Sequence, residues 1–179
     1  MKSTILKYGL LSGGVMILIF SISFALMKPA PENYRIGEII GYSTMILSML
    51  VIYIACNEYR LQQPGQSVTF GQVFRLGIAI SAIAGTMFGI FNWVYVEIFH
   101  PEFMEEYYSY FVESVKNSGA SEAEIAETLK RLESEKEMFS SPAVQFFTMF
   151  ITVFMIGAIV TLVTSFIQSK KAAPELAHS

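Results

Sequence analysis

The chain has 179 residues, of which 53% are hydrophobic and only 15% are charged, with a formal net charge of −3. Soluble domains carry about 25% charged residues, so this depletion indicates a membrane protein. The acidic balance without a basic stripe argues against a nucleic-acid partner. All fifteen acids are Glu, and the lack of Asp removes most calcium-loop and phosphoryl-transfer chemistry.

Four uncharged blocks are long enough to cross a bilayer, which takes about 20 apolar residues at a rise of about 1.5 Å each. They predict spans at about residues 8–27, 39–57, 76–96 and 143–168. The fourth begins after Ser141 and Pro142, because Ser is a favoured N-cap and Pro a favoured first helical residue. The first block also resembles a signal peptide with a cleavage site at residues 23–25, but its apolar run is long for that role, and we expect an uncleaved span.

The basic residues predict the orientation of the spans. Four spans put both termini on one side, and each side then carries six Lys or Arg residues. All six on the terminal side lie close to a span, whereas three on the other side lie within a long insertion, which the positive-inside rule discounts. We therefore expect both termini in the cytoplasm. Arg60 and Arg75, which flank the second loop, are expected to reach anionic lipid headgroups.

The polar insertion at about residues 98–141 predicts an amphipathic helical hairpin. Its first helix starts after Pro101 with acids in its first turn, and its second starts at Ser121, with Glu124 completing a capping box. Apolar residues at four-residue spacing form one stripe on each helix. Residues 97–141 hold eleven Glu against four Lys or Arg. This surface is either simply solvated or a docking surface for a basic partner.

Small residues recur every four positions in the third span, at Gly77, Ser81, Gly85 and Gly89. Such spacing lets helix backbones approach closely in lipid, so it predicts a packing seam, to which Gly157 of the fourth span also contributes. The seam lies either inside the bundle, which we expect because a four-helix unit has its own contacts to fill, or between subunits, which would mean self-association.

Polar residues inside the predicted spans are few. Asn92 is the clearest, and we expect its amide to bond to a neighbouring helix. No span has an ionisable residue in its middle, which argues against a proton-coupled transporter and leaves a passive pore open.

Glu97 and His100 have the Glu-x-x-His spacing of di-metal helix bundles, but those sites need a second such pair and further carboxylates. The sequence also lacks the common catalytic motifs. We therefore expect no metal, no cofactor and no enzyme activity. The simpler interpretation of this stretch is that His100 and Pro101 end the third span.

Four short stretches carry a family resemblance: Gly9-Leu10 with Gly13-Gly14, residues 68–77, residues 99–103, and Gly157 with Ser165 before Lys170-Lys171. Over about residues 7–171 the chain resembles a family of small bacterial membrane proteins catalogued as domain of unknown function 4199. The resemblance implies a four-helix protein of the inner membrane of Gram-negative bacteria. It implies no activity, ligand or catalytic residue.

The sequence therefore predicts an all-α fold: one membrane domain over residues 1–179, with four transmembrane helices and an extracytoplasmic helical hairpin. The predicted function is that of a non-enzymatic structural or accessory component. It would act in the lipid bilayer through helix packing and through contact of the hairpin with a basic extracytoplasmic partner. The alternative is a small channel or a permease-like component.

Overall fold

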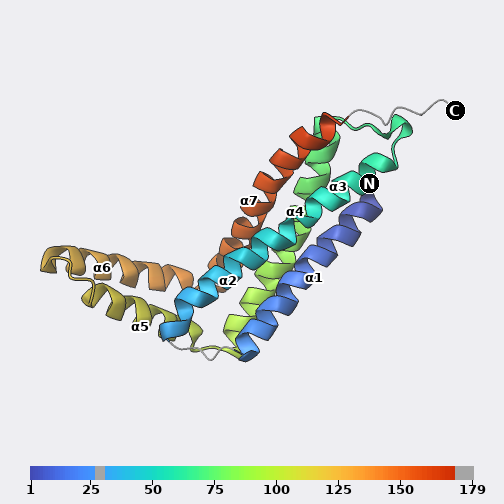
Figure 1. Cartoon of the computed structure of the whole chain (residues 1–179). Helices are drawn as coiled ribbons and strands as arrows, with labels where there is room; N and C mark the ends of the chain where they lie inside the picture. The colour runs from blue at the N-terminus through green and yellow to red at the C-terminus, as the bar shows by residue number, and fades with distance from the viewer. Residues whose placement is uncertain (27–30, 172–179) are drawn as a thin grey trace.

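The computed structural model describes residues 1–26 and 31–171, which are almost entirely helical and, within those ranges, contain no strand. Four helical segments form a bundle, and a hairpin of two helices projects from one end of it (Figure 1). The predicted all-α fold is confirmed. The bundle consists of α1 (Lys2–Leu26), α2 (Pro31–Met49) continued by α3 (Val51–Leu61), α4 (Phe70–Val94) continued by the π-helical η2 (Tyr95–Phe99), and α7 (Pro142–Ser169). The hairpin consists of α5 (Phe103–Lys116) and α6 (Glu122–Phe139).

Four helical stretches are long and apolar enough to cross a membrane: residues 2–26, 33–61, 70–99 and 142–169. They extend beyond the predicted spans at most of their ends, because a helix keeps its backbone hydrogen bonds as it passes into polar sequence. The predicted end of the first span, at residue 27, lies outside the described residues.

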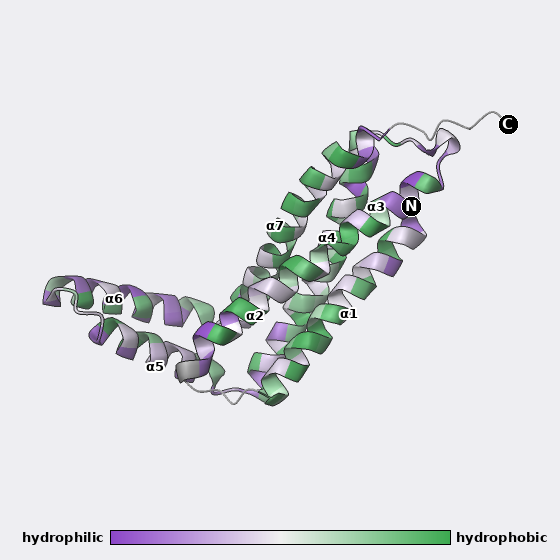
Figure 2. Ribbon diagram, viewed as in Figure 1, coloured by the Kyte–Doolittle hydropathy of each residue, from purple (hydrophilic) through white to green (hydrophobic). Residues whose placement is uncertain are grey.

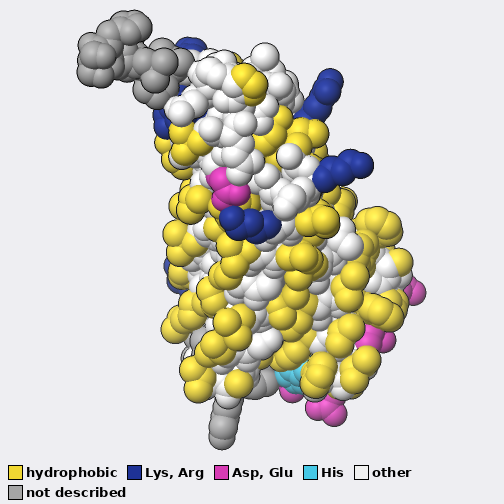
Figure 3. All heavy atoms as spheres, turned by 90° about the vertical axis from the view of Figure 1, so that its right-hand side faces the viewer, with side chains coloured by type: hydrophobic (Ala, Val, Ile, Leu, Met, Phe, Trp, Pro, Cys, Tyr) yellow, Lys and Arg dark blue, Asp and Glu magenta, His cyan; other side chains and the backbone are white. Residues whose placement is uncertain are grey.

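The outer surface of the bundle is apolar. Leu18 of α1, Leu47 of α2 and Ile159 of α7 are 60%, 65% and 61% exposed. Apolar residues dominate the bundle helices, whereas the hairpin alternates polar and apolar residues (Figure 2). On the face shown in Figure 3, apolar side chains predominate below a group of Lys and Arg side chains, with polar side chains and backbone between them. Lipid tails solvate such a surface, whereas water would not.

Helix α4 occupies the centre of the bundle. It packs against α7 along most of its length and against α1 on another side. It starts with a capping box, in which Thr69 accepts the backbone N–H of Gln72 and Gln72 returns a bond to the backbone N–H of Thr69. This reciprocal pair satisfies two of the free N–H groups at the helix start. The largest fully buried side chains include Phe88, Leu76 and Ile80, all from α4.

The second predicted span consists of two helices, α2 and α3, which meet at Leu50. The backbone N–H of Leu50 is shared between the carbonyl oxygens of Ile46 and Leu47, at 3.2 Å from each. Neither Pro nor Gly stands at this break, so the sequence there carries no breaker residue that would predict it.

Helix α1 begins and α7 ends at the same end of the bundle, opposite the hairpin (Figure 1). At that end Glu58 of α3 accepts hydrogen bonds from Lys7 Nζ at 2.8 Å and from the hydroxyl of Tyr8 at 2.5 Å. These contacts tie α1 to α3.

Arg60, at the same end, is buried rather than directed to lipid headgroups. It is only 8% exposed, and its guanidinium donates to Gln168 Oε1 at 3.1 Å, to the carbonyl oxygen of Gln66 at 3.0 Å and to Asn57 Oδ1 at 3.3 Å. The expectation for Arg60 was therefore wrong, because neutral acceptors on α3, α7 and the following loop draw it inward. Arg75 is exposed.

Candidate functional site

The small residues of α4 face α7 of the same chain. A Cβ added to Gly89 would lie 2.9 Å from the backbone oxygen of Phe146, and one added to Gly85 would lie 3.0 Å from that of Phe150. The two backbones are therefore as close as glycine allows. Further along the seam, Gly77 meets the side chain of Thr161, and Gly157 of α7 meets that of Ser81.

The hairpin is attached to the bundle at its base. The hydroxyl of Tyr107 on α5 donates to Glu38 Oε1 on α2 at 2.9 Å, and the ring of Tyr107 lies 5.4 Å from that of Tyr34 on α2. Burial and, second, this bond to Glu38 raise the pKa of Tyr107 above its ordinary value. The hydroxyl therefore stays protonated and remains a donor.

A second attachment involves His100, at the end of η2. Its Nε2 lies 3.3 Å from Glu106 Oε2 on α5, and its Nδ1 lies 3.4 Å from the hydroxyl of Tyr95. The imidazole thus joins the end of the third span to the first turns of the hairpin. It could relay a proton between a hydroxyl and a carboxylate, although both distances are long for strong hydrogen bonds.

Glu97 is exposed and is not joined to His100 by any hydrogen bond or ion pair within the described residues. The predicted Glu-x-x-His pair assumed α-helical spacing. In η2 the N–H of His100 bonds to the carbonyl oxygen of Tyr95, five residues back, and His100 itself leaves helical geometry at φ −144° and ψ 69°. This turn directs His100 to Glu106 instead. No group of three or more potential metal ligands occurs in the part of the chain that the structure describes.

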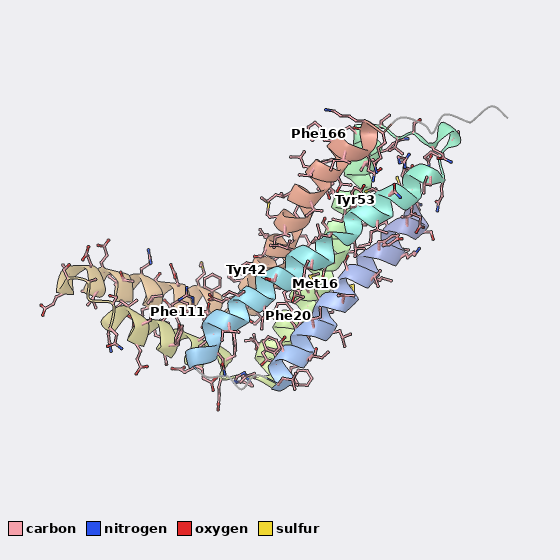
Figure 4. The ribbon with its side chains drawn as sticks, in the orientation of Figure 1. Met16, Phe20, Tyr42, Tyr53, Phe111 and Phe166 are labelled. Carbon is pink, nitrogen blue, oxygen red and sulfur yellow. The ribbon has the colours of Figure 1, made fainter. Side chains whose placement is uncertain are left out.

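A chamber of about 550 Å³ lies between the bundle and the hairpin. It is open rather than sealed, and α1, α2, α4, α5, α6 and α7 all contribute to its walls. Most of the lining is apolar, from Phe20, Phe24, Met45, Phe111, Phe139 and Met149. Figure 4 places Phe20 and Tyr42 on the bundle side and Phe111 on the hairpin.

A few polar groups interrupt these apolar walls. Gln145 of α7 is only 5% exposed; its Nε2 donates to the carbonyl oxygen of Phe139 at 3.1 Å, and its Oε1 has no partner within the described residues. Asn92 also lines the chamber. Its expected bond to a neighbouring helix is absent from the described part of the chain, because Asn92 faces this space rather than a helix–helix contact.

The outer surface of the hairpin is acidic. Neither α5 nor α6 contains a fully buried residue, so all their side chains keep some exposure. Lys136 of α6 holds the two helices together, with its Nζ 3.1 Å from Glu105 Oε1 on α5. The exposed acids of this segment are Glu102, Glu105, Glu113, Glu122, Glu124, Glu127, Glu133 and Glu137.

Sequence reasoning identified the seam and the hairpin as separate features but missed the chamber. Its position depends on the angle at which the hairpin leaves the bundle, which periodicity does not encode. One signal was present: Gln145, a polar residue near the start of the fourth span.

A family model described as "Protein of unknown function (DUF4199)" matches residues 7–170 of the chain. No curated protein and no solved structure gives a significant match.

Proposed function

We propose that this protein is a non-enzymatic accessory protein of the membrane. The chain belongs to the DUF4199 family, as the resemblance of its sequence predicted. It holds its helices in one rigid bundle and contacts a basic partner through the hairpin. The family has no known function, so the proposal rests on this chain's own geometry.

The observation that carries the proposal is the form of the hairpin. It leaves the bundle as a separate arm, and eleven Glu against four Lys or Arg occupy residues 97–141. A surface of one sign attracts a partner of the other sign and raises its rate of association. The incomplete burial of both helices also leaves apolar stem and ring surface for a partner to cover.

The seam between α4 and α7 supports the scaffold part of the proposal. Close backbone contact over several turns fixes the third and fourth spans relative to each other. The hairpin connects these same two helices, so its base is mounted on the best-packed part of the molecule.

Photo-crosslinking in intact cells tests the partner. A photo-reactive residue at the exposed position Ala126 on α6 should crosslink to a second, basic protein, and the same residue at the lipid-facing Leu18 should not. The double substitution Glu127→Lys and Glu133→Lys should remove that crosslink, whereas Glu97→Lys outside the hairpin should leave it. A crosslink to a second copy of the chain would replace the basic partner with self-association, and no crosslink would refute the proposal.

We also propose that the protein lies in the inner membrane of a bacterium with both termini in the cytoplasm, on the distribution of basic residues near span ends. Cys56, the one cysteine of the chain, is fully buried, so it leaves a low background for thiol labelling. Ser134→Cys on the hairpin should react with an impermeant reagent in intact cells, and Ser67→Cys only after permeabilisation. The reverse pattern would invert the orientation.

The second candidate is a small channel or permease-like component, and the chamber is the observation that favours it. The closely packed seam weighs against it, because α4 and α7 leave no space between their backbones along several turns. Reconstituted liposomes separate the two functions: an accessory protein gives no solute or ion flux, whereas reproducible flux would favour the channel.

A further inference from the structure

We propose that the chamber binds one ethanolamine phospholipid of the surrounding bilayer, with its ammonium group at Glu38 and an acyl chain along the apolar wall. This inference goes beyond the proposed function, because it concerns a lipid ligand inside the protein rather than a protein partner outside it.

The size and the lining of the chamber suit an amphipathic molecule. Its volume of about 550 Å³ falls within the range of about 300–1,000 Å³ that is usual for small-molecule sites. The apolar walls come from both sides, with Phe20 and Met149 on the bundle and Phe111 and Phe139 on the hairpin. A hydrocarbon chain is the occupant that such walls favour.

One face of α2 supplies a site for an ammonium group. Tyr34, Glu38 and Tyr42 follow one another at four-residue spacing, and all three line the chamber. Tyr107 completes the group from the hairpin by its bond to Glu38 Oε1. Glu38 is otherwise exposed, so its second carboxylate oxygen is open to a ligand. A carboxylate among aromatic rings attracts an ammonium ion through both charge and cation–π contact.

The other charges around the chamber fit a zwitterionic headgroup. Glu135 is a second acid in the lining, and Lys136 is the one cation among the described lining residues. The Nζ of Lys136 lies 3.1 Å from Glu105 Oε1, so a phosphate at this position would share the ammonium group with Glu105. Glu135 is paired with Arg131, whose Nε lies 3.6 Å from Glu135 Oε1. Glu38 is therefore the lining acid that is complementary to the ammonium of the headgroup.

The hydrogen bonds of the headgroup decide between lipids. An ethanolamine ammonium donates hydrogen bonds to a carboxylate such as Glu38, whereas a trimethylated choline group does not. Gln145 in the wall does not contribute to this choice, because its unpartnered Oε1 has almost no accessible surface and a headgroup in the chamber does not reach it.

Lipid competition on the unmodified protein is the primary test. The full chain in mild detergent, stripped of lipid, is incubated with an equimolar mixture of ethanolamine, choline and glycerol phospholipids that share the same acyl chains. Native mass spectrometry then reads the lipids retained on each chain. We expect one tightly held ethanolamine phospholipid, preferred over each of the others by about tenfold, since one charge-assisted hydrogen bond is worth about that factor.

One variant connects this preference to the chamber. Glu38→Gln keeps an acceptor for Tyr107 but removes the charge, and it should reduce the preference to about threefold or less, because the charge-assisted hydrogen bond is lost. Glu97→Gln is the matched control, an exposed acid at the same end of the bundle outside the chamber, and should keep it.

Equal retention of the three headgroups, or no retained lipid, would overturn the proposal, and this outcome needs no variant. A preference that survives Glu38→Gln would overturn it too. Charge reversal at Glu127 and Glu133 should leave lipid retention unchanged, so failure of the hairpin's partner contact and failure of lipid binding are distinguishable.

Discussion

Replacing Gly89 by Ala tests the seam at its tightest backbone contact. The added Cβ would lie 2.9 Å from the backbone oxygen of Phe146 and 2.8 Å from its ring, whereas ordinary contact begins at 3.4 Å. A backbone oxygen cannot change rotamer, so α7 must move away from α4 by about 0.5 Å. A gap of that size loses about a quarter of the dispersion energy of each contact that it opens. Such overpacking typically costs about 1–3 kcal/mol.

Gly14→Ala in α1 is the matched control, because a Cβ there would meet no atom within 4 Å. Both substitutions share the gain in helix propensity, about 1 kcal/mol at most, so the difference between them isolates the steric cost. We expect Gly89→Ala to be less stable than Gly14→Ala by about 1–3 kcal/mol in unfolding by SDS in mixed micelles, followed by circular dichroism. Equal stability of the two variants would refute the close approach of α4 to α7.

Four further results are expected. Ser121→Ala should destabilise α6 by about 1 kcal/mol through loss of its N-cap, read as reduced helicity or faster amide exchange in the hairpin. Hydrogen bonds from Ser121 lower the pKa of Glu124 below its ordinary 4.5. The stabilisation of the hairpin by ionised Glu124 is therefore present above pH 4.5 and is lost as the pH falls through the lowered pKa. Helicity of the hairpin that is insensitive to this acidification would contradict the capping box. Arg60→Lys should destabilise the bundle by about 1–3 kcal/mol, because one ammonium cannot reach three acceptors on three segments, and unchanged thermal unfolding would count against that network. The double substitution Glu97→Gln and His100→Gln should leave every activity measured for the unmodified protein unchanged. Loss of such an activity in the double variant would support an enzyme function.

The sequence was most informative where local chemistry determines structure. Blocks without charge identify helices that can cross a membrane, because the hydrocarbon core excludes ionised side chains whatever their neighbours. Capping patterns were equally local: Ser121 with Glu124 starts α6, and Gly119 stands in the turn before it at φ +73°. A positive φ is a conformation that glycine adopts without strain.

The parts that the sequence did not predict depend on contacts between segments. The burial of Arg60 depends on acceptors from α7 and from the loop, one of them more than one hundred positions away in the chain. The pairing of His100 with Glu106 depends on a π-helical turn, which has no simple composition signal. The chamber depends on the angle between hairpin and bundle, and no periodic pattern records such an angle.

The central position of α4 has a consequence for how the protein is made. Spans enter the membrane in chain order, so α4 arrives with only α1, α2 and α3 beside it, and its glycine face lies open to lipid until α7 emerges. The 47 residues between the end of α4 and the start of α7 take about 2–9 s to synthesise at about 5–20 residues per second. During that interval α7 does not yet cover the glycine face of α4, and the best-packed contact of the bundle is missing. Truncation after the hairpin should therefore give a short-lived fragment rather than a stable three-span protein.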